Sequence, residues 1–474
     1  MVRKVISVSK ERWTPQQQEA IHARCGNLLV AAAAGAGKTS VLVERIISYL
    51  KDRENPIDVD RLLVVTFTNA AAAQMREKIG RELTRELNAR PTDRHLRRQL
   101  TLLNHASIAT LHSFCLEVLR QHFYRLDLDP GFRVADDGEA GLLQLEVLED
   151  LLETKYQSDD YETNNEAFLT LVDCYGGERD DAGLIELILN LYRFARSTPW
   201  PEQWLQQAAD QLAMAEQGTL DDFAWCAKLK QNIALHLTGC RQSLAQAIDL
   251  CARPQAPLAY LDNLYADLDQ VQGLLTACSG TWEKLAQQFQ AVQFGRLRPV
   301  RKKDAIDPVI QEQVKNLRDK AKKQITSLRE TYFVQSPAEQ LNDLRQVAPL
   351  MRTLVQLVLE FGENFRQAKN KRGIVDFNDL EHYCLQILLQ EGASPGELKP
   401  SPVAEELQAR FVEVLVDEYQ DINAVQEAIL QLVSRQQAQQ PNLFMVGDVK
   451  QSIYRFRLAE PGLFLTKYQQ FSVE

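Results

Sequence analysis

The stretch LLVAAAAGAGKTSVL (residues 28–42) holds the strongest structural signal in this chain. Its first residues are continuously apolar, as expected of a buried parallel strand, and a helical pattern begins near Lys38. Between them, Gly35 and Gly37 let backbone N–H groups turn inward around an anion. A strand, a loop of small residues and a helix in this order predict a phosphate-binding loop.

This loop offers candidate ligands for a nucleoside triphosphate and its metal ion. Lys38 is expected to reach the β and γ phosphates, and Thr39 to offer its hydroxyl to Mg²⁺. The general pattern has glycine where this chain has Ala32, so a chance match is the alternative at this point. The expected nucleotide-binding residues of the loop are Ala32, Ala33, Ala34, Gly35, Ala36, Gly37, Lys38, Thr39 and Ser40.

A second strand-like segment, residues 412–416, ends in two carboxylates, Asp417 and Glu418. Because parallel strands present their carboxyl ends at one edge of a sheet, we expect these acids beside the phosphate loop. Asp417 is then the candidate Mg²⁺ ligand, and Glu418 the candidate catalytic base that orients or deprotonates the attacking water. Two adjacent acids are otherwise common in solvated turns, and the phosphate loop favours the catalytic interpretation.

Five short apolar segments bracket the chain and predict one parallel sheet: 28–32, 62–67, 107–110, 412–416 and 443–446. Helical patterns follow them, such as the stripe that recurs every four residues at Met75, Ile79, Leu83 and Leu87, after the capping residues Thr68 and Asn69. From 127 to 371 the pattern is helical and rich in Leu, Gln and Ala. We expect an α/β domain, residues 1–126 and 372–474, interrupted by a large α-helical insertion at 127–371.

Composition limits how this chain could bind nucleic acid. It has 474 residues, a net charge of −10 and a pI near 5.4, so any such site must be local. The window 296–324 holds ten Lys or Arg against four Asp or Glu, which suits either a solvated helix face or phosphate contacts. The eight cysteines form no CxxC pair, and no apolar run has the length of a signal peptide or a membrane span, so a cytoplasmic location is expected.

Further motifs resemble those of UvrD/PcrA-type superfamily 1 helicases, and most closely the AddA-type helicase/nuclease subunits of bacterial AddAB complexes. Such helicases use alanine-rich phosphate loops, which accounts for Ala32. The motifs that carry the resemblance are WTPQQQEAI (13–21), VTFTNAAA (65–72), TLHSFC (110–115), VDFNDLEHY (375–383), LVDEYQDIN (415–423) and FMVGDVKQSIYRFR (444–457).

The resemblance implies a RecA-like P-loop NTPase domain with a 1B-like insertion, ATP and Mg²⁺ as ligands, and single-stranded and duplex DNA as partners. It implies that Gln17 reads adenine and that Gln451 senses the γ-phosphate, joining Lys38 and Glu418 in the catalytic set. Without it, Phe67 would pass for a core aromatic and His112 for an ordinary loop histidine. The DNA-binding residues that it implies are Phe67, Thr68, Asn69, His112, Ser113, Tyr454, Phe456 and Arg457.

The resemblance also implies a 3′ to 5′ DNA helicase in double-strand-break repair and recombination, with an AddB-type partner protein in a heterodimer. Complete members continue into a second RecA-like domain, and AddA-type members into a nuclease domain. Neither is recognisable here, so we expect an N-terminal fragment that binds ATP-Mg²⁺, hydrolyses it slowly and does not unwind duplexes. Two alternatives stay open: a non-motor module that holds nucleotide and single-stranded DNA, and a plain UvrD-type helicase without a nuclease.

Overall fold

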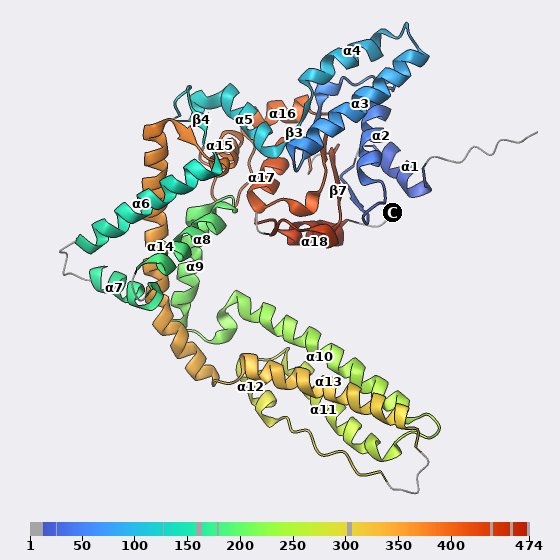
Figure 1. Cartoon of the computed structure of the whole chain (residues 1–474), viewed down its shortest axis with the longest axis vertical. Helices are drawn as coiled ribbons and strands as arrows, with labels where there is room; N and C mark the ends of the chain where they lie inside the picture. The colour runs from blue at the N-terminus through green and yellow to red at the C-terminus, as the bar shows by residue number, and fades with distance from the viewer. Residues whose placement is uncertain are drawn as a thin grey trace, which may run out of the picture. The chain divides into compact units, whose positions relative to one another are not determined.

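The computed structural model describes residues 13–24, 26–126, 128–157, 164–177, 180–300, 306–436, 439–455 and 458–471 (Figure 1). Its central feature is a five-stranded sheet in the order β1-β7-β6-β2-β3, in which every pair of neighbours is parallel. The predicted α/β fold is confirmed, and each expected strand forms to within one residue at either end. The strands are β1 (Leu28–Ala31), β2 (Leu62–Thr66), β3 (Ser107–Thr110), β6 (Glu413–Val416) and β7 (Leu443–Gly447).

The two faces of this sheet carry separate hydrophobic cores, because alternate strand residues point to opposite sides. Val416 and Met445 pack on one face against α5, α15, α16 and α17, and Leu415 and Phe444 pack on the other against α1 to α4. The helices of the first face are α5 (Leu111–His122), α15 (Phe377–Leu388), α16 (Pro402–Arg410) and α17 (Ala424–Val433). Those of the second are α1 (Pro15–His22), α2 (Lys38–Leu50), α3 (Asn69–Ala89) and α4 (Arg94–Leu102).

Helix α3 illustrates how local sequence fixes these elements. The hydroxyl of Thr68 caps the helix by accepting a hydrogen bond from the Ala71 N–H at 3.1 Å. Of the predicted stripe, Met75, Ile79 and Leu83 are fully buried, whereas Leu87, near the end of the helix, is only partly buried. The apolar repeat therefore decides which face of α3 packs against the sheet.

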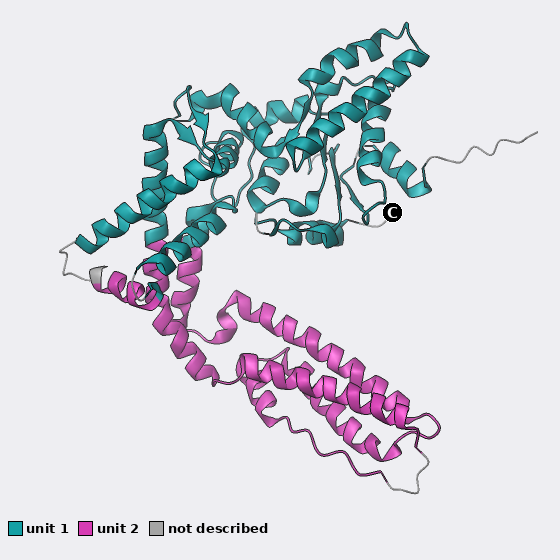
Figure 2. Ribbon diagram, viewed as in Figure 1, with its two compact units in different colours: residues 1–159, 175–205, 357–474 teal, residues 160–174, 206–356 magenta. Residues whose placement is uncertain are grey.

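The chain divides into two compact units (Figure 2). Unit 1 comprises residues 1–159, 175–205 and 357–474, and unit 2 comprises 160–174 and 206–356. Unit 2 has a helical core of its own, built mainly from α10 (Ala224–Cys251), α11 (Leu261–Ala277), α12 (Trp282–Ala291) and α13 (Pro308–Tyr332). Unit 1 thus includes parts of the segment 127–371, and the insertion boundaries at 127 and 371 stay a prediction.

The structure also contains a second, two-stranded parallel sheet, which the sequence patterns do not predict. Its strands pair only two residues each, which is too short for any periodic pattern to show. Within the described ranges, no helix is both long and apolar enough to cross a lipid bilayer. The elements not yet given are β4 (Arg133–Val134), β5 (Ile374–Val375), α6 (Asp137–Gln157), α7 (Asn164–Tyr175), α8 (Ala182–Arg196), α9 (Pro201–Ala213), α14 (Pro337–Arg372) and α18 (Pro461–Gln470).

The basic window 296–324 has a mixed environment in unit 2. Arg318 of α13 is buried and donates a hydrogen bond to Asp267 at 2.6 Å, so this charge serves the core of the unit. Lys320, Lys322 and Lys323 are exposed, and residues 301–305 lie outside the described part of the chain. Contact between this window and nucleic-acid phosphates stays a prediction.

A buried ion pair ties the helix after the phosphate loop to the strand that carries the two acids. Arg45 of α2 and Glu413 of β6 are 2% and 3% exposed. The Arg45 Nε lies 3.1 and 3.0 Å from the two Glu413 carboxylate oxygens, and its Nη1 donates to the Ala20 carbonyl at 2.8 Å. The guanidinium binds the Glu413 carboxylate in a bidentate way, and a further N–H is hydrogen-bonded to the Ala20 carbonyl. This pair therefore fixes α2 against β6.

Removing one partner should leave the other charge buried without compensation. We expect Glu413→Ala to lower the free energy of unfolding by about 3–5 kcal/mol. Glu363→Ala removes a half-exposed partner of Arg366 and should cost under about 1 kcal/mol. Urea unfolding of both variants checks this, and equal losses would contradict a structural role for the buried pair.

Candidate functional site

The expected site residues gather at the carboxyl edge of the sheet. The phosphate loop follows β1, Asp417 and Glu418 follow β6, and the segment with Gln451 follows β7. Because all five strands run parallel, these loops emerge on the same edge. The strand order also separates the edge into two parts, with the phosphate loop at β1 and the expected DNA-contacting residues at the ends of β2 and β3.

The phosphate loop has the backbone that an anion site requires. Gly35 and Gly37 have φ angles of 77° and 81°, in the left-handed region that residues with a Cβ rarely adopt. Gly37 immediately precedes α2, so the positive end of this helix faces the loop. Ala33, Ala34 and Ala36 are exposed, and Thr39 and Ser40 lie in the first turn of the helix.

Lys38 lies beside the two acids that follow β6, Asp417 and Glu418. Its Nζ lies 3.5 Å from Glu418 Oε2, although Glu418 follows Lys38 by 380 positions in the sequence. Lys38 Nζ and Asp417 Oδ1 are both buried and have no hydrogen-bond partner among the described residues. Buried polar atoms without a hydrogen-bond partner are rare in folded proteins. The ammonium suits a phosphate, and the carboxylate oxygen and the nearby Thr39 hydroxyl suit Mg²⁺, so these residues fit the expected ligands.

The electrostatics of the two acids differ. Burial and the neighbouring Glu418 carboxylate raise the pKa of Asp417 to about 6, and the Lys38 charge only partly offsets this rise. Glu418 is more exposed and has a φ of 54°, an unfavourable conformation for a residue with a side chain. Strain of this kind concentrates at functional positions, where the surrounding structure holds it.

Gln420 is a central residue of the site that the sequence analysis does not identify. It is 1% exposed, and its amide nitrogen donates to Glu418 Oε2 at 2.8 Å and to Asp421 Oδ2 at 3.1 Å. Its amide oxygen accepts the Asp448 N–H at 2.9 Å, and a Cβ at Gly447 would lie 2.4 Å from that oxygen. Because the Gln420 amide donates to carboxylates and accepts from a backbone N–H at the same time, it links the ends of β6 and β7.

Two glutamines expected at the nucleotide are engaged within the protein. Gln17 accepts the Thr14 N–H at 2.9 Å and donates to the Ala36 carbonyl at 3.0 Å, so both ends of its amide are used. Gln451 donates to the Asp448 carboxylate. Their roles toward adenine and the γ-phosphate stay predictions, and each amide keeps further donor and acceptor capacity beside these bonds.

Aromatic and polar groups line the β2 and β3 side of the edge. The rings of Phe67 and Tyr454 lie 4.2 Å apart between centroids, which brings together two expected DNA-contacting residues from distant segments. Thr68, Asn69 and Ser113 are exposed and His112 is 38% exposed. Phe456 and Arg457 lie outside the described residues.

Phe377 also belongs to this group, although the sequence analysis assigns it no role. It is 43% exposed, and its ring meets that of His112 edge-to-face at 5.4 Å and 82°. An exposed aromatic ring at the first position of a helix is the available signal, but only its contact with His112 places it beside the other residues.

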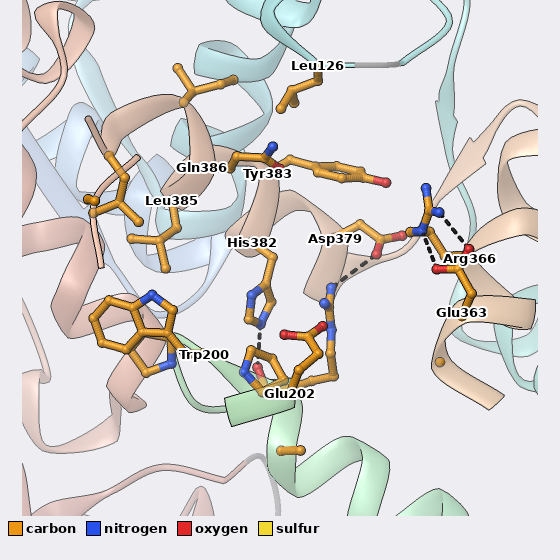
Figure 3. Close-up of a pocket in the computed structure, with 18 of the residues that line it drawn as sticks. Leu126, Trp200, Glu202, Glu363, Arg366, Asp379, His382, Tyr383, Leu385 and Gln386 are labelled. Atoms are coloured by element: carbon orange, nitrogen blue, oxygen red, sulfur yellow. Dashed lines mark hydrogen bonds and ion pairs between the residues drawn. The ribbon is translucent and has the colours of Figure 1, made fainter. Parts of the chain in front are cut away.

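A cavity of about 1300 Å³ lies on another side of α15 (Figure 3). Its wall includes Asp379, His382, Tyr383 and Gln386 of this helix. Several charged lining groups are paired with one another, as in the Glu363–Arg366 pair at 2.7 Å and the Arg196–Asp379 pair at 3.1 Å. None of the expected site residues that the structure describes lines this cavity, so it is separate from the described part of the carboxyl edge.

Comparison with known proteins gives the family of this chain. The model of the UvrD/REP helicase N-terminal domain matches residues 13–472. The chain belongs to this family. The resemblance to UvrD-type helicases is therefore confirmed.

Curated relatives of this UvrD/REP-type chain include several proteins named as ATP-dependent helicase/nuclease subunits. The relative from Pelotomaculum thermopropionicum is 54% identical over 462 residues, which cover 97% of this chain and 36% of the relative. That from Desulforamulus reducens is 51% identical over 466 residues, covering 98% and 37%. That from Heliobacterium modesticaldum is 50% identical over 476 residues, covering 97% and 33%. The chain thus spans about a third of the length of these relatives.

The raised pKa of Asp417 predicts a stability effect. The Asp417 carboxyl has a pKa of about 6 in the folded state, above its ordinary pKa of 3.8. As the pH rises from about 4 to above 6, its ionisation therefore lowers the free energy of unfolding. We expect Asp417→Asn to raise the free energy of unfolding of the nucleotide-free protein by about 1–3 kcal/mol at pH 7.5. At pH 4 the gain should disappear. Urea unfolding at both pH values measures this, and a variant less stable at pH 7.5 would contradict the account.

Proposed function

We propose that this chain is the ATP-binding, DNA-translocating core of a superfamily 1 DNA helicase. The approach of Lys38 Nζ to Glu418 Oε2, with a buried unpartnered oxygen on Asp417, carries the proposal. A lysine and two carboxylates at a glycine-turned loop provide the groups that phosphoryl transfer to water requires. Membership of the UvrD/REP family supports the same conclusion.

In this proposal each residue has a defined task. Lys38 and the loop N–H groups neutralise the phosphates of ATP. Thr39 and Asp417 would hold Mg²⁺, which supplies positive charge to the phosphate oxygens when bound. Glu418 accepts a proton from the attacking water or orients it, and Gln420 fixes the direction of the Glu418 carboxylate.

The DNA-binding part of the proposal rests on the other half of the sheet edge. Phe67 and Tyr454 form an aromatic pair that suits stacking on bases of single-stranded DNA. Asn69, His112 and Ser113 add polar groups at the ends of β2 and β3. Because Gln451 and Tyr454 lie three residues apart, one short segment connects the nucleotide with the strand.

The functions of a larger protein are also proposed here from its relatives. Their printed names describe ATP-dependent helicase/nuclease subunits. We infer 3′ to 5′ translocation on DNA, a role in double-strand-break repair and recombination, and an AddB-type partner protein. Duplex DNA is then the substrate that the complete assembly unwinds.

Replacing the base should abolish hydrolysis but not binding. We expect Glu418→Gln to lower ATP hydrolysis with single-stranded DNA by roughly 10²- to 10⁴-fold, with nucleotide affinity nearly unchanged. Lys38→Ala should weaken nucleotide binding itself, since it removes the cation that faces the phosphates. Single-turnover hydrolysis and titration with a fluorescent ATP analogue measure the two effects, with Glu397→Gln as an exposed control. Full hydrolysis by Glu418→Gln would refute the assignment, and a wild type that binds ATP without turnover would favour the non-motor module.

A second variant tests the link between nucleotide and DNA. Gln451→Ala removes the amide expected to sense the γ-phosphate but leaves the aromatic pair in place. We expect basal hydrolysis to persist while stimulation by single-stranded DNA is lost. The ratio of rates with and without oligonucleotide measures this, and an unchanged ratio would show that Gln451 does not couple the sites.

A further inference from the structure

A buried carboxylate lies directly beneath the expected DNA-contacting surface. Glu381 of α15 is 2% exposed, and its Oε1 lies 3.0 Å from His112 Nε2. Gln426 donates to the same oxygen at 2.6 Å, and Asn423 donates to Oε2 at 3.4 Å. These hydrogen bonds and this ion pair involve no residue of the phosphate loop and neither Asp417 nor Glu418.

Helix α15 presents two distinct faces. Phe377 and Glu381 lie four residues apart and therefore share one face, which meets His112 of α5. Asp379, His382, Tyr383 and Gln386 line the cavity in Figure 3 instead. The Glu381 cluster is thus part of the sheet-edge surface and separate from the cavity.

A buried carboxylate needs compensation, and His112 is its candidate countercharge. Burial opposes ionisation of Glu381, but the hydrogen bond and charge of His112 and the Gln426 amide together lower the pKa of Glu381. His382 also faces it, yet burial and the Arg196 charge lower the pKa of His382 to about 3, so that ring is neutral. Burial raises the pKa of the neighbouring Cys115 thiol, which rests against Cys384. The amides of Asn423 and Gln426 carry no charge.

The position of His112 makes this carboxylate significant. His112 lies in the first turn of α5, directly after the end of β3. The positive end of a helix disfavours a cation in its first turn. A carboxylate 3.0 Å from the ring nitrogen favours the protonated, cationic form of the histidine instead. At the same time 38% of the histidine side chain stays accessible. A protonated His112 would present positive charge at the surface with its counterion buried.

We propose that Glu381 is a positioning residue that holds His112 as an oriented imidazolium, so that the first turn of α5 binds a phosphate of single-stranded DNA. The inference rests on the proposed function, because it assumes that DNA crosses this edge of the sheet. It extends that function by assigning a role to a buried side chain that cannot touch DNA itself.

The test is the pH dependence of DNA binding by the 474-residue chain. Affinity for an oligo-dT labelled with a pH-insensitive dye is measured by anisotropy from pH 5.5 to 8.5. Wild-type affinity should fall as the pH rises and the imidazolium loses its proton. Glu381→Gln keeps the shape but removes the charge, so its fall should come at least one pH unit lower. At pH 7.5 the variant should bind roughly three- to tenfold more weakly, with a salt slope smaller by about 0.7.

Matched variants separate positioning from folding. His112→Gln should remove the pH step, and adding Glu381→Gln to it should change nothing more. Glu381→Gln/His112→Lys should recover affinity without the pH step, because lysine carries its charge unaided. Glu363→Gln, in the wall of the separate cavity, should match the wild type.

The outcomes that overturn the proposal are distinct. If Glu381→Gln shifts neither the affinity nor its pH midpoint, or weakens binding equally at every pH, Glu381 does not set the charge of His112. If the Gln variant is too unstable to assay, the His112→Gln pH profile decides: a profile with the wild-type step refutes the proposal. A wild type that binds no single-stranded DNA at any pH contradicts the proposed function as well.

Discussion

The parallel pairing of β7 between β1 and β6 is the constraint on which the rest of this structure depends. β1 and β6 come from opposite ends of the chain, and only this pairing puts the phosphate loop and the two acids on the same sheet edge. The buried Arg45–Glu413 pair reinforces the arrangement, since it joins the helix after the loop to the strand that bears the acids. The long intervening segment is tolerated because these contacts fix the sheet independently of its length.

Two buried side chains organise the reactive edge from beneath. Gln420 holds the Glu418 carboxylate and links it to the segment after β7, which continues to Gln451 and Tyr454. Glu381 holds His112 and accepts hydrogen bonds from Asn423 and Gln426 at the start of α17. α17 begins three residues after Asp421. Gln420, which holds Glu418, and the two residues that bind Glu381 are therefore close together in the sequence. The segment from Asp417 to Gln426, which joins the two sets of contacts, is therefore where a change at the nucleotide residues could reach the DNA-contacting residues.

Local pattern was sufficient for the elements that have a strong periodic or conformational signature. Buried parallel strands are continuously apolar, and the loop glycines are required by positive φ angles, so both could be predicted. The convergence of Lys38 with Glu418 also followed, because strand direction alone places them at one edge. The roles of Gln420 and Glu381 could not be predicted, since an amide or acid within a motif shows its partners only when distant segments are brought together. The bond from Gln17 to the Ala36 carbonyl was hidden for the same reason, whereas its bond with Thr14 belongs to a local capping box that the spacing of the two residues could have indicated.

The most direct test of the central claim is a crystal structure of the chain with Mg²⁺ and a non-hydrolysable ATP analogue. We expect the γ-phosphate within hydrogen-bonding distance of Lys38 Nζ, and the metal ion between that phosphate, Thr39 and Asp417. A nucleotide bound at another surface, or one whose phosphates contact the loop while Asp417 and Glu418 face away from them, would contradict it.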